Sequence, residues 1–215
     1  GAEIEGEGSD TIRVRGFSSR EQVRFRIPSD RIASASYLCF ALASRGEITL
    51  LDCPVSELRP VLQQLGALGA EVREGANTLT LRMPRRPRGS LSVSSGPYPL
   101  FPTDAMPLLL AVCASAEGES TFRENIFSDR LRYVPALQAM GADIRADRRE
   151  AAVRGVERLH GAAVEGTDLR GSAALLCAAL GAEGESVIRD AGHLERGYER
   201  ADALLRQLGA EIKKE

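Results

Sequence analysis

Three aspartates in this chain each follow a serine or threonine, and each opens a run of small apolar residues: Asp30, Asp104 and Asp168. A carboxylate at the start of such a run has two chemical roles open to it. It can cap a helix by accepting backbone N–H groups, or it can act as a general base toward a hydroxyl group. Pattern alone favours capping, and a capping carboxylate is a weak base because the helix end stabilises its charged form.

Arginine supplies nearly all of the positive charge, because the only lysines are Lys213 and Lys214. An anion site in the folded body must therefore use guanidinium groups, backbone N–H groups and helix ends. The formal net charge of -2 argues against general nucleic-acid binding, which depends on neutralising phosphates. The Pro- and Arg-rich stretch 84–88 is accordingly interpreted as a solvated connector between strands.

One tetrapeptide of glycine, alanine, an acidic residue and isoleucine or valine occurs four times, beginning at Gly1, Gly69, Gly141 and Gly209. The last three copies follow apolar-periodic stretches, which predict helices that stop at the glycine. These stretches are 58–68, 134–140 and 201–208. Alternating residues after a polar turn, as at 11–15 and 78–82, predict β-hairpins.

The runs that the three aspartates open end at Gly46, Gly118 and Gly184 and are apolar nearly all round, so each predicts a buried helix. A cysteine stands nine residues after each aspartate, which marks a core position rather than a metal ligand or a disulfide partner. Short strands follow at 47–51, 120–123 and 186–189. The predicted unit is strand, buried helix, strand, surface helix and two strands (βαβαββ), used three times at about 22–82, 90–155 and 162–215.

We therefore expect an α/β fold with three parallel helices in the centre and sheets outside. The N-termini of these helices would converge on one face, where their summed dipoles favour an anionic ligand. The ends of the chain do not match this plan, because the third unit stops short of its hairpin while residues 1–16 form a hairpin with no preceding helix. A piece of a larger, cyclically arranged protein would have this pattern.

The 215 residues are 43% hydrophobic and 27% charged, which predicts one soluble globular domain that buries roughly 70% of its unfolded surface. No apolar run approaches the ~20 residues of a spanning helix, and no secretory signal is present. We expect a cytoplasmic protein with no membrane partner. The sequence holds no phosphate-loop motif, and we expect neither a cofactor nor a metal.

Four motifs carry a family resemblance: Phe101-Pro102-Thr103-Asp104, Thr167-Asp168-Leu169-Arg170, Arg196-Gly197-Tyr198-Glu199-Arg200 and Pro28-Ser29-Asp30-Arg31-Ile32. Because the four motifs occur in this order and with this spacing, the chain resembles the C-terminal half of the UDP-N-acetylglucosamine enolpyruvyl transferases over nearly its whole length. The resemblance implies an inside-out α/β barrel and a cytoplasmic enzyme of peptidoglycan synthesis. That enzyme transfers enolpyruvyl from phosphoenolpyruvate to the 3-hydroxyl of UDP-N-acetylglucosamine.

The resemblance also implies a division into domains. Residues 17–215 correspond to the C-terminal domain and residues 1–16 to a hairpin of the inter-domain crossover. The family's proton-donating Cys loop and its essential Lys belong to an N-terminal domain that has no counterpart here. We therefore expect the chain alone to be inactive.

The resemblance assigns roles to single residues. Asp104 matches the base at the substrate 3-hydroxyl, and Arg196 matches an arginine that binds phosphoenolpyruvate, which makes these two the catalytic candidates. Arg130 and Arg170 match arginines that face the cleft, where a random arginine would be expected in a surface ion pair.

Other matches belong to the substrate site or depart from the family. Ile126 and Phe127 match a segment that contacts the nucleotide sugar, although a Phe after a strand is usually core. Asp30 and Asp168, at the equivalent corners, are counted with the substrate-binding residues. Three positions depart from the family pattern, since Ser128 and Asp129 replace Glu-Asn and Glu195 replaces Asp. His193 matches a family His, but a lone histidine at the end of a strand is more readily explained as structural.

Two other functions stay open at this stage: a non-catalytic binding module that kept the fold, and a relative of enolpyruvylshikimate-phosphate synthase, which Ala35-Ser36-Tyr37 slightly resembles. The unmatched ends give a further prediction. Residues 11–15 should pair beside residues 209–213, within one chain or swapped between two, because an unpaired sheet edge is a liability that chains usually cover.

Overall fold

The computed structural model describes residues 2–7, 9–16 and 22–214. Its strands are β1 (Glu3–Glu5), β2 (Arg13–Arg15), β3 (Glu47–Leu51), β4 (Glu71–Glu74), β5 (Thr78–Arg82), β6 (Ser92–Ser94), β7 (Glu119–Arg123), β8 (Asp143–Ala146), β9 (Glu150–Arg154), β10 (Ala163–Glu165) and β11 (Val187–Arg189). Its helices are α1 (Arg31–Ala43), η1 (Val55–Leu58), α2 (Arg59–Ala67), α3 (Met106–Cys113), α4 (Val134–Ala139), α5 (Leu169–Gly181), η2 (Ala191–Arg196) and α6 (Ala201–Gln207).

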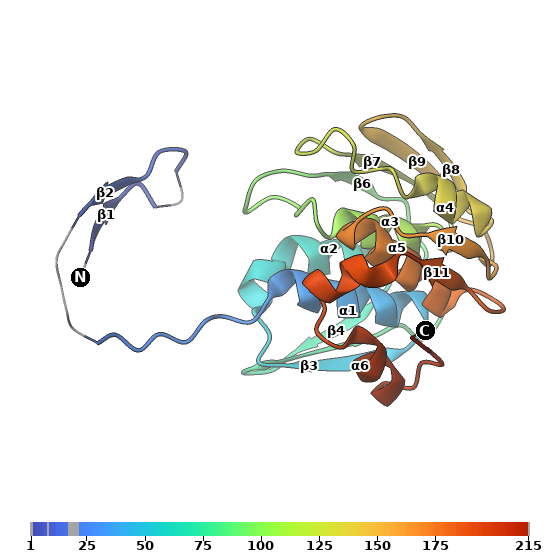
Figure 1. Ribbon diagram of the computed structural model, residues 1–215, viewed down its shortest axis with the longest axis horizontal. Coiled ribbons are helices and arrows are strands. Elements are labelled where there is room, and N and C mark those ends of the chain that lie inside the picture. Colours follow the sequence, from blue (N-terminus) through green and yellow to red (C-terminus); the bar gives the residue numbers. More distant parts are fainter. Residues whose placement is uncertain (1, 8, 17–21, 215) are drawn as a thin grey trace.

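Three helices, α1, α3 and α5, pack against one another in the middle of the molecule (Figure 1). Every residue of α3 is buried, which explains why its sequence is apolar on all sides. Cys39, Cys113 and Cys177 all lie in this core. The predicted α/β fold with three buried helices is confirmed.

Three sheets lie outside these helices, in the strand orders β3-β5-β4, β6-β7-β9-β8 and β10-β11. The predicted hairpin of β4 and β5 is present and antiparallel, and β8 and β9 form its counterpart in the second sheet. The third sheet has two parallel strands, β10 and β11, and α6 follows them toward the C-terminus. Each sheet therefore holds the strand that follows one of the buried helices.

The three surface helices end alike. Gly69, Gly141 and Gly209 have φ angles of 94°, 90° and 98°, a left-handed conformation that a side chain would strain. The alanine after each glycine donates its N–H to a leucine carbonyl five residues earlier, as in the bond from Ala210 N to Leu205 O at 2.9 Å. This geometry is the helix stop that the repeated tetrapeptide predicts.

The prediction for the ends of the chain is wrong within a single molecule. β2 pairs with β1 in an antiparallel hairpin, and residues 209–213 form no strand in the described part of the chain. A hairpin closes a short loop, which costs less entropy than closing a loop of about two hundred residues. Pairing between two chains stays a prediction.

The first repeat also lacks its leading strand. Residues 22–29 are exposed and have no regular secondary structure, and Val23, Phe25 and Ile27 are 83%, 78% and 82% exposed. The alternation of apolar and arginine residues suits a strand, but within the described residues no neighbouring strand pairs with it. A strand without a ladder partner is not stable by itself.

The interpretation of stretch 84–88 as a solvated connector is wrong for two residues, since Pro87 is buried and Arg86 is half-buried. The Arg86 side chain donates to the carbonyl oxygens of Ser115 and Val156 at 2.9 and 2.7 Å, with longer contacts to those of Ala116 and Gly155. Carbonyls just beyond the C-terminal end of α3 lack helical partners, and a guanidinium can serve several of them at once.

We expect Arg86→Ala to lower the free energy of unfolding by about 2 to 3 kcal/mol, because partly buried carbonyls lose a charged donor. Urea denaturation followed by circular dichroism measures this change. Arg85→Ala is the matched control, since Arg85 is exposed in the same loop, and it should stay within about 0.5 kcal/mol of the wild type. Equal losses in the two variants would contradict the anchoring role of Arg86.

The buried thiols predict a pH dependence. Burial raises the pKa of Cys113 to about 12, and it also raises the pKa of Cys39 and Cys177. Because these folded-state values lie above the unfolded ones, the stabilisation is complete below about pH 8.5 and is lost as the pH rises further. We expect the free energy of unfolding to fall above that pH with a slope of up to about 4 kcal/mol per pH unit for three thiols.

Urea titrations at several alkaline pH values test this expectation. Replacing one of the three cysteines by alanine should lower the slope by about one third, because one thiol fewer ionises on unfolding. An unchanged slope would mean that other groups cause the alkaline loss.

No helix within the described residues has the length and apolar character needed to cross a membrane.

Candidate active site

Asp104 does not cap the helix that follows it. The N-cap of α3 is Ala105, and the carboxylate of Asp104 instead accepts hydrogen bonds from two arginines. Arg130 Nη2 lies 2.8 Å from Oδ1, and Arg170 Nη2 lies 3.1 Å from Oδ2. The side chain of Asp104 is 33% exposed while those of the two arginines are 13% and 14% exposed, so the carboxylate is open to solvent on one side.

The other two aspartates do cap their helices, as the pattern predicts. Asp30 Oδ1 accepts from the N–H groups of Ile32 and Ala33 at 2.7 and 3.2 Å at the start of α1. Asp168 Oδ1 accepts from the backbone N–H groups of Arg170 and Gly171 at 2.9 and 3.0 Å at the start of α5. Only the carboxylate of Asp104 is thus free of capping, and the general preference for caps fails at that position.

Arg130 is held from two further sides. Its Nε donates to Thr103 Oγ1 at 3.3 Å, and its guanidinium lies 4.5 Å from the centre of the Phe127 ring, within the range of a cation–π contact. Phe127 and Ile126 are 50% and 39% exposed, so this segment is not core. The predicted residues Asp104, Arg130 and Phe127 therefore lie together.

Arg170 is held through a buried tyrosine. Its Nη1 donates to the Tyr198 hydroxyl at 3.2 Å, and that hydroxyl lies 2.7 Å from Ser36 Oγ on α1. Burial lowers the pKa of Arg170, but Tyr198 and Asp104 together raise it above its ordinary value. Burial likewise raises the pKa of Tyr198, against the opposing effects of Ser36 and Arg170. Arg170 therefore stays cationic and Tyr198 neutral at physiological pH.

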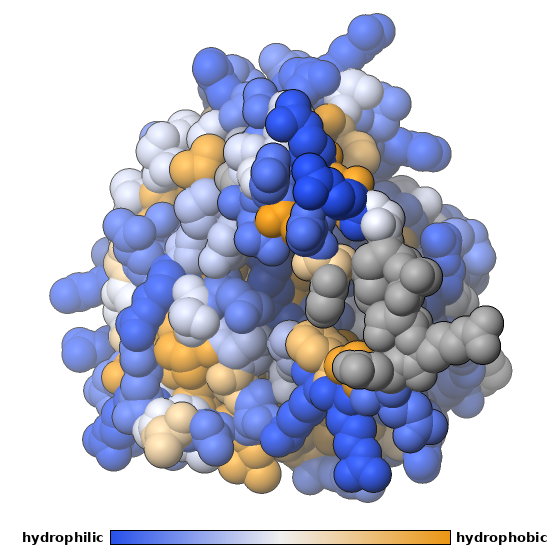
Figure 2. Space-filling model, turned by 90° about the vertical axis from the view of Figure 1, so that its left-hand side faces the viewer, coloured by the Kyte–Doolittle hydropathy of each residue, from blue (hydrophilic) through white to orange (hydrophobic). Residues whose placement is uncertain are grey.

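A continuous set of hydrogen bonds links the first half of α1 to the starts of α3 and α5. It runs from Ser36 through Tyr198 and Arg170 to Asp104, and on to Arg130. The predicted convergence of the three helix starts on one face stays a prediction. Figure 2 views the end of the molecule where α1 begins, where orange apolar patches lie among blue charged side chains around a central hollow.

Other predicted residues lie outside this set. Arg196 is exposed at the end of η2, and no hydrogen bond or ion pair of its side chain occurs among the described residues. His193 Nε2 lies 3.6 Å from the exposed carboxylate of Asp190, and the structural interpretation of this histidine stays a prediction. Glu195, the departure from the family, pairs with Lys214.

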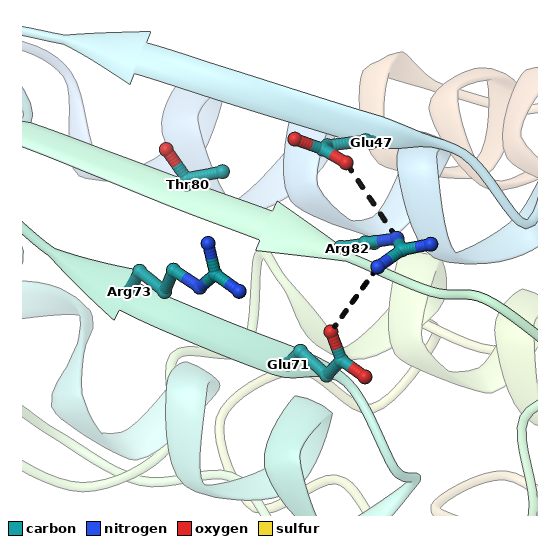
Figure 3. A pocket seen from close by; sticks show the side chains of 5 residues that line it. All are labelled: Glu47, Glu71, Arg73, Thr80 and Arg82. Carbon is teal, nitrogen blue, oxygen red and sulfur yellow. Dashed lines mark ion pairs between the residues drawn. The ribbon is translucent and has the colours of Figure 1, made fainter.

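A small hollow elsewhere does not suit a nucleotide sugar. Figure 3 shows it on the sheet of β3, β5 and β4, where Arg82 lies between Glu47 and Glu71 at 3.6 and 3.8 Å. Its volume of about 60 Å³ is far below that of typical ligand pockets, and its charges already neutralise one another. Among the described residues, no group of three His, Cys, Asp or Glu side chains could hold a metal ion.

The family model for EPSP synthase (3-phosphoshikimate 1-carboxyvinyltransferase) matches residues 1–205 of the chain. The chain belongs to the EPSP synthase family. The motif resemblance is confirmed at the same time, since related proteins of this family named UDP-N-acetylglucosamine 1-carboxyvinyltransferase match the chain from end to end. Those from Caldanaerobacter subterraneus and a Psychrobacter species are 39% and 40% identical over 99% and 100% of the chain.

Two solved structures are similar to the chain. The enolpyruvyl transferase NikO from Streptomyces tendae has a TM-score of 0.86 at 29% identity and covers 99% of the chain. An EPSP synthase from Acinetobacter baumannii has a TM-score of 0.64 at 20% identity over 89% of the chain, which supports the fold alone. The chain spans about half the length of these proteins: 51% and 49% of the two curated relatives, and 51% of the NikO chain.

Glu124 and Tyr198 have contacts at the site that the sequence analysis did not assign to them. Glu124 had a usable signal: in β7, residues 120 and 122 point into the core, and residue 124 continues that alternation with a carboxylate. A charged residue at an inward position needs hydrogen-bond partners, so this pattern predicts a polar cluster around Glu124. Tyr198 lay within a quoted motif, but its contact with Ser36 joins residues 162 positions apart and leaves no local signal.

Proposed function

We propose that this chain is the C-terminal domain of a UDP-N-acetylglucosamine 1-carboxyvinyltransferase and acts in peptidoglycan synthesis in the cytoplasm. The observation that carries the proposal is the carboxylate of Asp104, which is free of capping, partly open to solvent and flanked by two largely buried arginine side chains, 13% and 14% exposed. The names of the relatives at about 39% identity supply the substrate class. The proposed boundaries are a crossover hairpin over 1–16 and an inside-out, threefold α/β barrel over 17–215.

In the proposed reaction, Asp104 takes the proton of the sugar 3-hydroxyl as its oxygen bonds to C2 of phosphoenolpyruvate. C3 gains a proton to give a tetrahedral adduct, which then loses phosphate from C2 and a proton from its C3 methyl group to leave the enolpyruvyl ether. Both carboxylate oxygens of Asp104 already accept from arginines, so the substrate hydroxyl has to take the place of one of them. Arg130, Arg170 and Arg196 are suited to hold phosphate and carboxylate groups, because a guanidinium binds such oxyanions in a bidentate manner.

The nucleotide sugar is proposed to lie along Ile126 and Phe127, near the capped helix starts at Asp30 and Asp168. The proton donor to C3 is proposed to come from an N-terminal domain, so that the 215-residue chain alone binds ligand without turnover. A strand-swapped dimer, in which β2 of one chain pairs near residues 209–213 of another, is the proposed alternative to that partner. Reaction by this route needs neither a metal nor a cofactor.

Isothermal titration calorimetry tests the substrate class. UDP-N-acetylglucosamine should give measurable heat with the chain, and shikimate 3-phosphate should give none. The reverse result would favour the enolpyruvylshikimate-phosphate synthase alternative. Binding of neither ligand, by a chain whose circular dichroism spectrum shows it to be folded, would favour a module that kept the fold and lost the chemistry.

A further inference from the structure

Glu124, directly after β7, is a fully buried carboxylate that no catalytic step above uses. Both of its oxygens accept hydrogen bonds. Oε1 accepts from Ser95 Oγ at 2.8 Å and from the backbone N–H groups of Ile126 and Phe127 at 2.7 and 3.0 Å. Oε2 accepts from Thr103 Oγ1 at 2.7 Å.

These bonds connect two parts of the site that are otherwise separate in the chain. One is the segment that carries Ile126 and Phe127, and the other is the turn before α3 that carries Asp104. A threonine hydroxyl has one proton to donate, and Thr103 donates it to Glu124. Its oxygen is thereby turned so that it can accept from Arg130 Nε, which lies 3.3 Å away.

We propose that Glu124 is a positioning residue, which fixes the 126–127 segment and, through Thr103, the orientation of Arg130 beside Asp104. The inference deepens the proposed function, and its part concerning the nucleotide sugar rests on that function. Burying a carboxylate is costly unless donors surround it, so a buried glutamate with four donors holds all four in fixed places.

Glu124→Gln tests the positioning role because it keeps the shape of the side chain and removes its charge. An amide oxygen can still accept from the two backbone N–H groups, but the amide nitrogen then faces Thr103 and donates to it. The Thr103 hydroxyl loses its acceptor and no longer presents a fixed oxygen to Arg130. Thr103→Val should have the same effect on Arg130, while Thr103→Ser keeps the hydroxyl and should restore the wild-type behaviour.

The experiment compares these variants of the full chain in two measurements. The first is the NMR signal of Arg130 Nε–H, which should shift in Glu124→Gln and Thr103→Val and stay in place in Thr103→Ser. The second is the affinity for UDP-N-acetylglucosamine, which should fall by about tenfold or more in the first two variants and stay within about twofold in the third. The double variant Glu124→Gln, Thr103→Val should lose no more affinity than the weaker-binding single variant, because both substitutions act through the hydrogen bond between Thr103 and Glu124.

Arg86→Ala is the control for a merely structural effect, since it should lower stability without touching this cluster. The variants are compared with Arg86→Ala at the same loss of stability. If Glu124→Gln and Thr103→Val then lose no more affinity for UDP-N-acetylglucosamine than Arg86→Ala does, the positioning role is overturned. An unshifted Arg130 signal in Glu124→Gln also overturns it. If the wild-type chain binds no UDP-N-acetylglucosamine, the proposed function fails, and the Arg130 signal still decides the role of Glu124.

Discussion

Asp104→Asn is expected to reduce turnover by about two orders of magnitude or more, since general base catalysis contributes about that much and an amide cannot take a proton. The enzyme to measure joins this chain to the N-terminal half of one of its relatives, because those relatives are about twice as long as the chain. The fold should survive because Asp104 caps no helix and asparagine can still accept from one of the two arginines. Steady-state kinetics and thermal unfolding give the two readouts.

The control for this experiment is Asp143→Asn, which changes the same residue type at an exposed position of β8. Turnover in that variant should match the wild type. Near-normal turnover in Asp104→Asn would assign Asp104 to the structure of the arginine cluster rather than to proton transfer. A loss of stability that accounts for the whole loss of activity would lead to the same conclusion.

Arg196→Ala in the joined enzyme is expected to weaken the use of phosphoenolpyruvate far more than the binding of UDP-N-acetylglucosamine. Removing a charge-assisted bidentate contact costs about 1.5 to 3 kcal/mol, which corresponds to roughly 10- to 150-fold in kcat/KM for phosphoenolpyruvate. Stability should hardly change, because Arg196 is exposed. Separate titrations of each substrate, with the other saturating, measure the two effects.

Arg189→Ala offers a matched control, because Arg189 is exposed on β11 and its ion-pair atom lies 3.9 Å from Glu165. It should leave both substrates unaffected. Equal losses for both substrates in Arg196→Ala would remove this residue from the phosphoenolpyruvate site. The result matters because, among the described residues, the exposed Arg196 side chain makes no hydrogen bond or ion pair with the cluster around Asp104.

Local sequence signals predicted most of the fold. Glycine in the left-handed conformation, carboxylate caps and apolar runs each act within a few residues, so the ends of α2, α4 and α6 and the starts of α1 and α5 followed from the sequence. The buried cysteines also fixed the register of the central helices. Errors occurred where long-range pairing decides the outcome, as at residues 11–15 and 22–27, because a strand exists only when another strand is beside it.

The site was predictable to a similar degree. Motifs singled out Asp104, Arg130 and Arg170, which the structure brings together, but capping was the favoured role for Asp104 on pattern alone. Pro107 stands in the first turn of α3, and the side-chain cap found at α1 and α5 is absent there. The contacts that define the cluster involve residues 26 and 66 positions apart at Asp104, and no local pattern encodes such separations.

The same separations determine when the cluster can form as the polypeptide emerges from the ribosome. Asp104 and Arg130 can meet once residues 104–130 have been synthesised, whereas the Tyr198 hydroxyl can reach Ser36 only after residues 36–198 have been synthesised. Contacts between such distant positions form late, because the intervening chain must first be ordered. Chains that end before residue 198 would therefore lack the link from Arg170 through Tyr198 to Ser36, and Arg170 would lose one of the two contacts that hold it beside Asp104.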